Sequence, residues 1–148
     1  MKKEIILVAF SILFFCSCHT GKGLVAVSSP NAPKAIGPYS HAIKTGNLIY
    51  TSGQIGLSPT TGALAGDDIS TQTRQALDNL KAVLQEAESD MAHVVKVTIF
   101  LKDLNDYAKV NDIYKDYFPE LKPARSAVQV ARLPKDALIE IECVATTN

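Results

Sequence analysis

Two segments of the chain carry apolar residues at helical spacing. Between residues 69 and 87 these positions recur every three or four residues, which predicts an amphipathic helix with one buried stripe. The stripe comprises Ile69, Thr73, Ala76, Leu77, Leu80, Val83, Leu84 and Ala87. A second helix is predicted from roughly residue 104 to 118, and Pro119 ends it because proline disrupts a helix interior. Its buried side is expected to hold Tyr107, Val110, Tyr114 and Phe118.

The other apolar runs are short or alternating, as in strands. In residues 94–101, VVKVTIFL, alternation places Val95, Val97, Ile99 and Leu101 on one face. Further strands are predicted within residues 23–29, 41–45 and 48–55 and in two runs of the C-terminal segment 123–142. The dipeptide Gly46-Asn47 predicts a hairpin turn, because both residues tolerate positive φ.

This order of elements predicts the fold class. Three strands, a helix, a strand, a second helix and two strands indicate a mixed α/β sheet with two helices on one face. Two helices cannot cover both faces of such a sheet. Because apolar strand faces are rarely left in water, the open face predicts a symmetric homo-oligomer.

The segment PARSAVQVARLPKDALIEIE places a charge in each of its two strand-like runs. Arg125 shares a face with Ala127 and Gln129, and Glu140 points away from the helices. The linker ARLPKD is short enough for a hairpin-like return, which would bring Arg125 within range of the strand of Glu140. One interpretation is an exposed ion pair worth less than about 1 kcal/mol, which the pattern alone favours. The other is a carboxylate-binding site with an acid/base beside it.

Other polar residues admit both a structural and a functional reading. Tyr39 lies in a Pro/Gly-rich loop and could donate its phenol to a ligand or simply pack. Ser52 and Gly53 end a strand and could offer a hydroxyl and a backbone N–H to a ligand. Asn111 lies within the second helix, where a solvated polar residue is the plain interpretation.

The N-terminus has the pattern of a bacterial export signal. A basic start is followed by an eleven-residue apolar run, which as a helix rises only about 16 Å and is too short to span a bilayer. Residues 1–17 are predicted to be a signal peptide, 18–23 a tether and 24–148 the folded domain. Lipidation of Cys18 is favoured over ordinary cleavage nearby. The protein is thus expected to be exported, as a periplasmic or membrane-tethered lipoprotein whose only membrane contact is the lipid anchor.

Composition narrows the range of functions. The chain has 15 basic and 15 acidic residues, so it lacks the excess positive charge that nucleic-acid binding needs. Neither a Gly-rich phosphate loop nor a metal-spaced His/Cys cluster is seen, and neither metal nor cofactor is expected. After loss of the signal, Cys143 is the one cysteine besides the lipid acceptor, so no internal disulfide is expected.

Four segments resemble the RidA (YjgF) family: NAPKAIGPYSHAIKTGNLIYTSGQIGLSPTTG, QTRQALDNLKAVLQEA, VVKVTIFLKDLNDYAKVNDIYKDYF and PARSAVQVARLPKDALIEIE. The match runs from residue 29 to about 145. The resemblance implies a chorismate-mutase-like α/β fold, assembled as a homotrimer with inward-facing sheets and with sites in clefts between subunits.

The resemblance also implies an activity, the hydrolysis of 2-enamine/2-imino acids such as 2-aminoacrylate and 2-aminocrotonate to 2-keto acids and ammonia, without a cofactor. By resemblance, Arg125 grips the substrate carboxylate with two parallel hydrogen bonds. Glu140 positions a water molecule and transfers a proton. Tyr39, Ser52, Gly53 and Asn111 line the cleft.

This chain departs from the family pattern at Ala127, where many members carry Cys and others Thr. The alternative function is a non-catalytic module that binds small carboxylates in the same cleft. An endoribonuclease or translation inhibitor ranks third, because neutral charge and export both argue against an RNA substrate.

Overall fold

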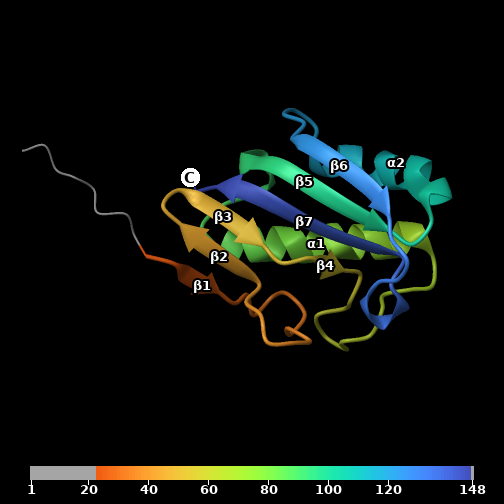
Figure 1. Cartoon of the computed structure of the whole chain (residues 1–148), viewed down its shortest axis with the longest axis horizontal. Helices are drawn as coiled ribbons and strands as arrows, with labels where there is room; N and C mark the ends of the chain where they lie inside the picture. Colours follow the sequence, from red (N-terminus) through yellow and green to blue (C-terminus); the bar gives the residue numbers. More distant parts are fainter. Residues whose placement is uncertain (1–22, 148) are drawn as a thin grey trace, which may run out of the picture.

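The computed structural model describes residues 23–147, which form one mixed sheet backed by two helices (Figure 1). The helices are α1 (Ile69–Glu86) and α2 (Tyr107–Tyr117). The strands are β1 (Val25–Val27), β2 (Ala42–Thr45), β3 (Leu48–Thr51), β4 (Gln54–Ile55), β5 (Val94–Leu101), β6 (Ala124–Gln129) and β7 (Ile139–Thr146). Short 3₁₀ turns are η1 (Met91–His93), η2 (Leu104–Asp106) and η3 (Pro134–Asp136). The predicted fold class is confirmed, and the signal peptide and Cys18 lie outside the described residues.

The sheet has the order β1-β2-β3-β7-β5-β6, with β4 also paired to β7. Every pairing is antiparallel except that of β5 with β6. Both helices lie behind the sheet in Figure 1, so the face toward the viewer carries no helix. Within residues 23–147, neither α1 nor α2 has the length and apolar character needed to cross a membrane.

Helix α1 follows the prediction closely. All eight residues of the predicted stripe are buried, and all but Thr73 belong to the main apolar core. Asp68 caps the N-terminus, because its carboxylate accepts the Thr71 N–H at 2.9 Å and so satisfies a free helix donor. The helix ends at Glu86, and Glu88 then adopts φ 61°.

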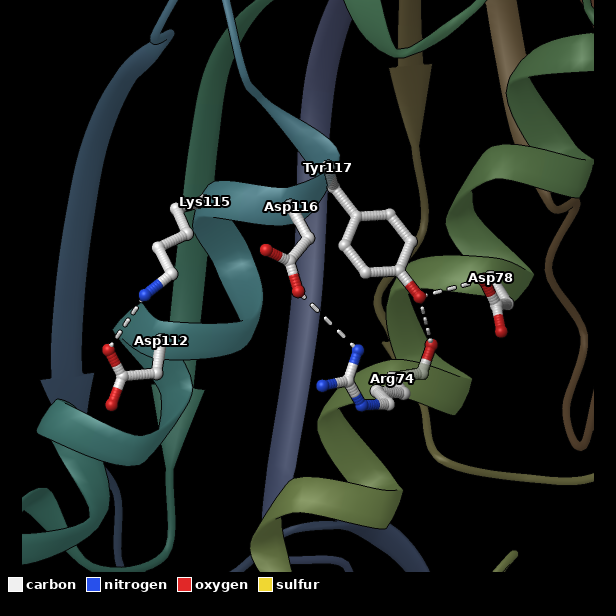
Figure 2. A network of polar contacts seen from close by, with 6 residues as sticks. All are labelled: Arg74, Asp78, Asp112, Lys115, Asp116 and Tyr117. Atoms are coloured by element: carbon white, nitrogen blue, oxygen red, sulfur yellow. Dashed lines mark hydrogen bonds and ion pairs between the residues drawn. The ribbon is translucent and has the colours of Figure 1, made fainter.

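Helix α2 is tied to α1 on the outer side of the molecule (Figure 2). The Tyr117 hydroxyl donates to Asp78 Oδ1 at 2.8 Å and also contacts the Arg74 carbonyl at 3.3 Å. Arg74 Nη1 in turn lies 3.6 Å from Asp116 Oδ2. These contacts fix the orientation of α2 and therefore of the side chains on its sheet-facing side.

The predicted strand 94–101 is confirmed, but one residue assigned to its buried face is exposed. Val97, Ile99 and Leu101 are buried as expected, whereas Val95 is 47% exposed. A β-bulge between Val94 and Lys96 shifts the register, so Val94 takes the buried position instead. The alternating pattern therefore predicted the buried face correctly only after the bulge.

The predicted buried face of the second helix is only partly right. Val110, Tyr114 and Phe118 are buried, but Tyr107 is 39% exposed. Tyr107 follows directly on η2, at the first turn of α2 and at the margin of the sheet. The Gly46-Asn47 hairpin is confirmed, since Gly46 has φ 57° and Thr45 pairs with Leu48.

The expected hairpin between the last two strands is wrong. The connection β5–α2–β6 is a crossover, which returns β6 parallel to β5 as such units do. Strand β7 then pairs with the other edge of β5, so β5 lies between β6 and β7. This arrangement places the apolar face of β7 in the centre of the core, where Ile139, Ile141 and Ala145 are fully buried.

Candidate active site

Arg125 and Glu140 lie on opposite faces of the sheet. Arg125 pairs with Val97, whose side chain faces the helices, so Arg125 is also on the helix side, on the edge strand β6. Glu140 alternates with the buried Ile139 and Ile141 and therefore points to the open face. The simple ion pair on one hairpin is thus wrong for a single copy. Glu140 and Arg125 line two separate cavities, which are called below the Glu140 half-site and the Arg125 half-site.

The Glu140 half-site is a cavity of about 290 Å³. Its lining residues are Ile36, Tyr39, Ser52, Gly53, Ile55, Pro134 and Glu140. Burial raises the pKa of the Glu140 carboxyl, and the neighbouring Glu142 carboxylate raises this pKa further. A carboxyl with a raised pKa holds its proton more readily and is suited to donate it to a bound ligand.

Gly53 gives the Glu140 carboxyl its space. An ideal Cβ built at Gly53 would lie 2.6 Å from Glu140 Cδ, closer than carbon atoms approach without bonding. The carboxyl therefore packs directly against the backbone of residue 53. Any side chain at this position would displace it.

Tyr39 and Ser52 form the polar rim of the same cavity. The Tyr39 hydroxyl oxygen accepts the Ile36 N–H at 3.2 Å, so its own hydrogen remains available to a ligand. The Ser52 hydroxyl instead donates to the Ser40 carbonyl at 2.7 Å, and only its oxygen lone pairs are left for a ligand. The Ser52 contact ties the loop before β2 to the end of β3, whereas the Tyr39 contact closes a turn within that loop.

The Arg125 half-site is built on helix α2. Arg125 Nη2 donates to the Tyr107 hydroxyl at 2.9 Å and to Asn111 Oδ1 at 2.7 Å. Its Cζ lies 4.5 Å from the centroid of the Tyr114 ring and 5.4 Å from that of Tyr107. Residues 107, 111 and 114 share one helix face because helical neighbours recur every three or four positions. Three α2 side chains thus fix one guanidinium.

Arg125 has no acidic partner among residues 23–147, and neither its Nη1 nor its Nε donates to a residue in that range. The free edge of the guanidinium can therefore hold a carboxylate through two parallel hydrogen bonds. Beneath it, burial raises the pKa of Tyr114 to about 12, although the Arg125 charge opposes this shift. Tyr114 is therefore a neutral ring that supports the cation.

The structure thus sorts the predicted residues into two groups. Glu140, Tyr39, Ser52 and Gly53 share one cavity, and Arg125 lies with Asn111 in another of about 350 Å³. Asn111 faces Arg125 rather than open solvent, which decides against its plain interpretation as a solvated residue. Ala127 packs partly buried against the main core from the same face as Arg125.

Sequence reasoning missed the role of Tyr107 and Tyr114. Both were assigned to packing because their spacing fits an apolar helix stripe. The available signal was Asn111, a polar residue placed between two tyrosines on the same face, which is unusual for a helix side that only packs. Among residues 23–147, no group of three or more His, Cys, Asp or Glu side chains is placed to hold a metal ion.

Comparison with known proteins agrees with this fold. A model of the family described as Endoribonuclease L-PSP matches residues 29–147. A RutC family protein from Pyrococcus horikoshii is 56% identical over 119 residues, covering 80% of this chain and 94% of that protein. A 2-iminobutanoate/2-iminopropanoate deaminase from Escherichia coli is 50% identical over 122 residues, covering 80% of this chain and 94% of that enzyme.

Solved structures show the same fold. The YjgF gene product of Escherichia coli superposes with a TM-score of 0.80 at 47% identity, covering 84% of this chain and 99% of that one. Escherichia coli TdcF with bound serine has a TM-score of 0.80 at 41% identity, with coverage of 84% and 99%. The mixed sheet with two helices on one face places the chain in the fold class of these solved structures. Within it, the chain belongs to the RidA (YjgF) family.

Proposed function

We propose that the protein hydrolyses reactive 2-imino acids and their enamine tautomers to 2-keto acids and ammonia. The observation that carries the proposal is Arg125, a guanidinium held by α2 yet paired with no carboxylate among residues 23–147. Relatives about 50% identical are named 2-iminobutanoate/2-iminopropanoate deaminase, which supports this substrate class.

The substrate carboxylate binds the free edge of Arg125. A planar guanidinium matches a carboxylate through two parallel hydrogen bonds and orients it more strictly than an ammonium group would. The tyrosine rings and Asn111 hold the guanidinium before the ligand arrives. Binding therefore loses little of its free energy to ordering the side chain.

Glu140 then assists the addition of water. A water oxygen bonds to the imine carbon, while the electron pair of the C=N π bond moves to nitrogen and takes a proton from Glu140. The Glu140 carboxylate removes a proton from the added water and passes it to nitrogen. As the C–N bond breaks and ammonia leaves, the carbonyl forms and the remaining hydroxyl proton returns to Glu140. The products are a 2-keto acid and ammonia. Tyr39 donates its free hydroxyl hydrogen to the substrate, while Ser52 and Gly53 shape the space around Glu140.

The complete site is proposed to form between two copies of the chain. The half-sites lie on opposite faces of the sheet, so a second copy must supply the missing half. Tyr50 and Val128 leave 47% and 44% of their surface exposed on the open face, where a second copy would cover apolar area. A closed ring of three is the assembly that the family resemblance implies.

A coupled assay tests the reaction. Threonine dehydratase generates 2-aminocrotonate, and semicarbazide traps the 2-imino acid unless it is hydrolysed first. The mature protein is expected to accelerate release of 2-oxobutanoate and ammonia and to reduce trapping. Unchanged trapping, with 2-oxobutanoate still bound in a titration, would favour a non-catalytic carboxylate-binding module instead.

Export through the N-terminal signal with a lipid on Cys18 is a separate proposal. It rests on the sequence pattern of residues 1–18. Cys18→Ala is expected to move the protein from the membrane fraction to the soluble fraction of a bacterial host. The same membrane association in wild type and Cys18→Ala would reject lipidation.

A further inference from the structure

The cavity around Arg125 holds more positive charge than one carboxylate requires. Three cationic side chains line it, from Lys115, Lys122 and Arg125. The other lining residues are Tyr107, Asn111, Tyr114, Phe118 and Pro123, none of which carries a negative charge. A cavity lined by charges of one sign attracts ligands of the opposite charge.

These three cations differ in how their charge is balanced. Lys115 Nζ lies 3.2 Å from Asp112 Oδ1 and is paired with it (Figure 2). Lys122 Nζ contacts only the Pro119 carbonyl among residues 23–147, at 3.4 Å, and a carbonyl carries no full charge. Arg125 is likewise without an acid in this part of the chain. Two of the three charges are therefore not neutralised.

The surroundings keep these two charges effective. Tyr114 and Phe118 are buried, with ring centroids 4.5 Å apart and ring planes tilted by 31°, so one wall of the cavity excludes water. Charges beside a low-dielectric wall interact more strongly than charges in open solvent. Pro123 also restricts the backbone of Lys122 to extended conformations, which holds this lysine near the start of β6.

We infer that this site selects 2-imino acids that carry a second carboxylate, with Arg125 binding the carboxylate next to the imine and Lys122 binding the distal one. The inference rests on the proposed function, because it uses Arg125 as the anchor. The flexible four-carbon stem of lysine lets it reach a distal group at more than one chain length. The substrate class is therefore the short 2-imino dicarboxylic acids, and their products are 2-keto dicarboxylic acids.

Calorimetric titration with two product analogues of similar length tests the selectivity. The dianion 2-oxoglutarate is expected to bind about five- to tenfold more tightly than the monoanion 2-oxohexanoate at low salt. The difference should shrink in 0.5 M salt, where the screening length falls to about 4 Å. Equal affinities at low salt would overturn the inference.

Lys122→Gln isolates the proposed charge. We expect the ratio of the two affinities to fall to about one, since the variant loses more affinity for the dianion than for the monoanion. Lys109→Gln is the matched control, because Lys109 lies on α2, is paired with Asp106 and does not line the cavity. A preference for the dianion that survives in Lys122→Gln would also overturn the inference.

The two proposals fail in different measurements. If wild type hydrolyses 2-iminobutanoate but binds both analogues equally, the dicarboxylate selectivity alone is wrong. If wild type prefers 2-oxoglutarate through Lys122 but reduces semicarbazide trapping of neither 2-iminobutanoate nor a short 2-imino dicarboxylic acid, the deaminase function is wrong and the charge selectivity stands. Lys109→Gln should match wild type in both measurements.

Discussion

The two half-sites hold their charged groups in opposite ways. Arg125 is fixed by two hydrogen bonds and two aromatic rings from one helix. Glu140 accepts no hydrogen bond from residues 23–147 and is placed by its strand and by the space that Gly53 leaves. An anchor benefits from being rigid before the ligand binds, whereas a proton-transfer group benefits from a pKa that burial has moved. In the proposed function, Arg125 serves binding and Glu140 serves proton transfer. Each substitution below should therefore affect either substrate binding or the chemical step more than the other.

Glu140→Gln should have the largest effect on catalysis. We expect kcat to fall about 10²–10⁴-fold with a small change in KM, because the amide keeps the shape but cannot transfer the proton. The measurement is steady-state hydrolysis of enzymatically generated 2-aminocrotonate. A fall below tenfold would mean that another group handles the proton.

The same variant makes a prediction for stability against pH. The folded-state pKa of Glu140 is raised above its ordinary 4.5, so the folded protein binds more protons than the unfolded chain between the two pKa values. Wild type should therefore lose stability as pH rises through this range. Glu140→Gln should melt at a higher temperature than wild type at pH 7 and show no such gain at pH 3.

Arg125→Ala should mainly weaken binding. Removing the anchor of a desolvated charge pair typically costs about 2–5 kcal/mol, so kcat/KM should fall at least thirtyfold, mostly through KM. Arg125→Lys should lie between Ala and wild type, because an ammonium keeps the charge but not the planar double hydrogen bond. A normal KM in Arg125→Ala would remove Arg125 as the carboxylate anchor.

Gly53→Ala tests how Glu140 is placed. The added methyl group would collide with the Glu140 carboxyl and move it, and a shift of about 1 Å can cost a factor of roughly 10² in rate. We expect kcat to fall while the affinity for 2-oxobutanoate stays within about twofold. Gly23→Ala is the control, since nothing lies within 4 Å of a Cβ there. Equal kcat in the two variants would show that Glu140 needs no such space.

Substitutions of Tyr114 should have the smallest effect on KM, and two of them distinguish the contribution of its ring from that of its hydroxyl. Tyr114→Leu removes the ring beneath Arg125 and should raise KM about fivefold, since a partly buried cation–π contact is worth about 1 kcal/mol. Tyr114→Phe keeps the ring and loses a buried hydroxyl without a hydrogen-bond partner among the described residues, so KM should stay near the wild-type value. A raised KM in Tyr114→Phe would show that the hydroxyl contributes to the site.

Much of the fold could be predicted from the sequence, because periodicity reports burial directly. The α1 stripe, the Gly46-Asn47 hairpin and the outward direction of Glu140 all follow from local patterns. The bulge at Val94–Lys96 could not be predicted, because an inserted residue changes the face without changing the type of the residues around it. The pairing of β6 with β5 depends on a long-range crossover, and local alternation carries no information on the partner strand.

The site was predicted as a set of residues but not as an arrangement. Charged residues in strand-like runs identified Arg125 and Glu140. Their separation onto two faces depends on the registers in which β6 and β7 pair with β5, since Arg125 lies opposite Val97 and Glu140 opposite Phe100. The roles of Tyr107 and Tyr114 could not be predicted, because an aromatic residue at helical spacing gives the same sequence pattern whether it packs in a core or against a guanidinium.

Mixing the two inactive variants tests the shared site most directly. Arg125→Ala and Glu140→Ala are co-expressed with different tags, and assemblies that contain both are purified by tandem affinity. In a cyclic trimer of mixed composition, one of the three interfaces joins an intact Arg125 to an intact Glu140, so we predict about a third of wild-type activity. The control pairs Glu140→Ala with the double variant, in which every interface is defective. Mixed assemblies that are as inactive as this control would contradict a site shared between copies.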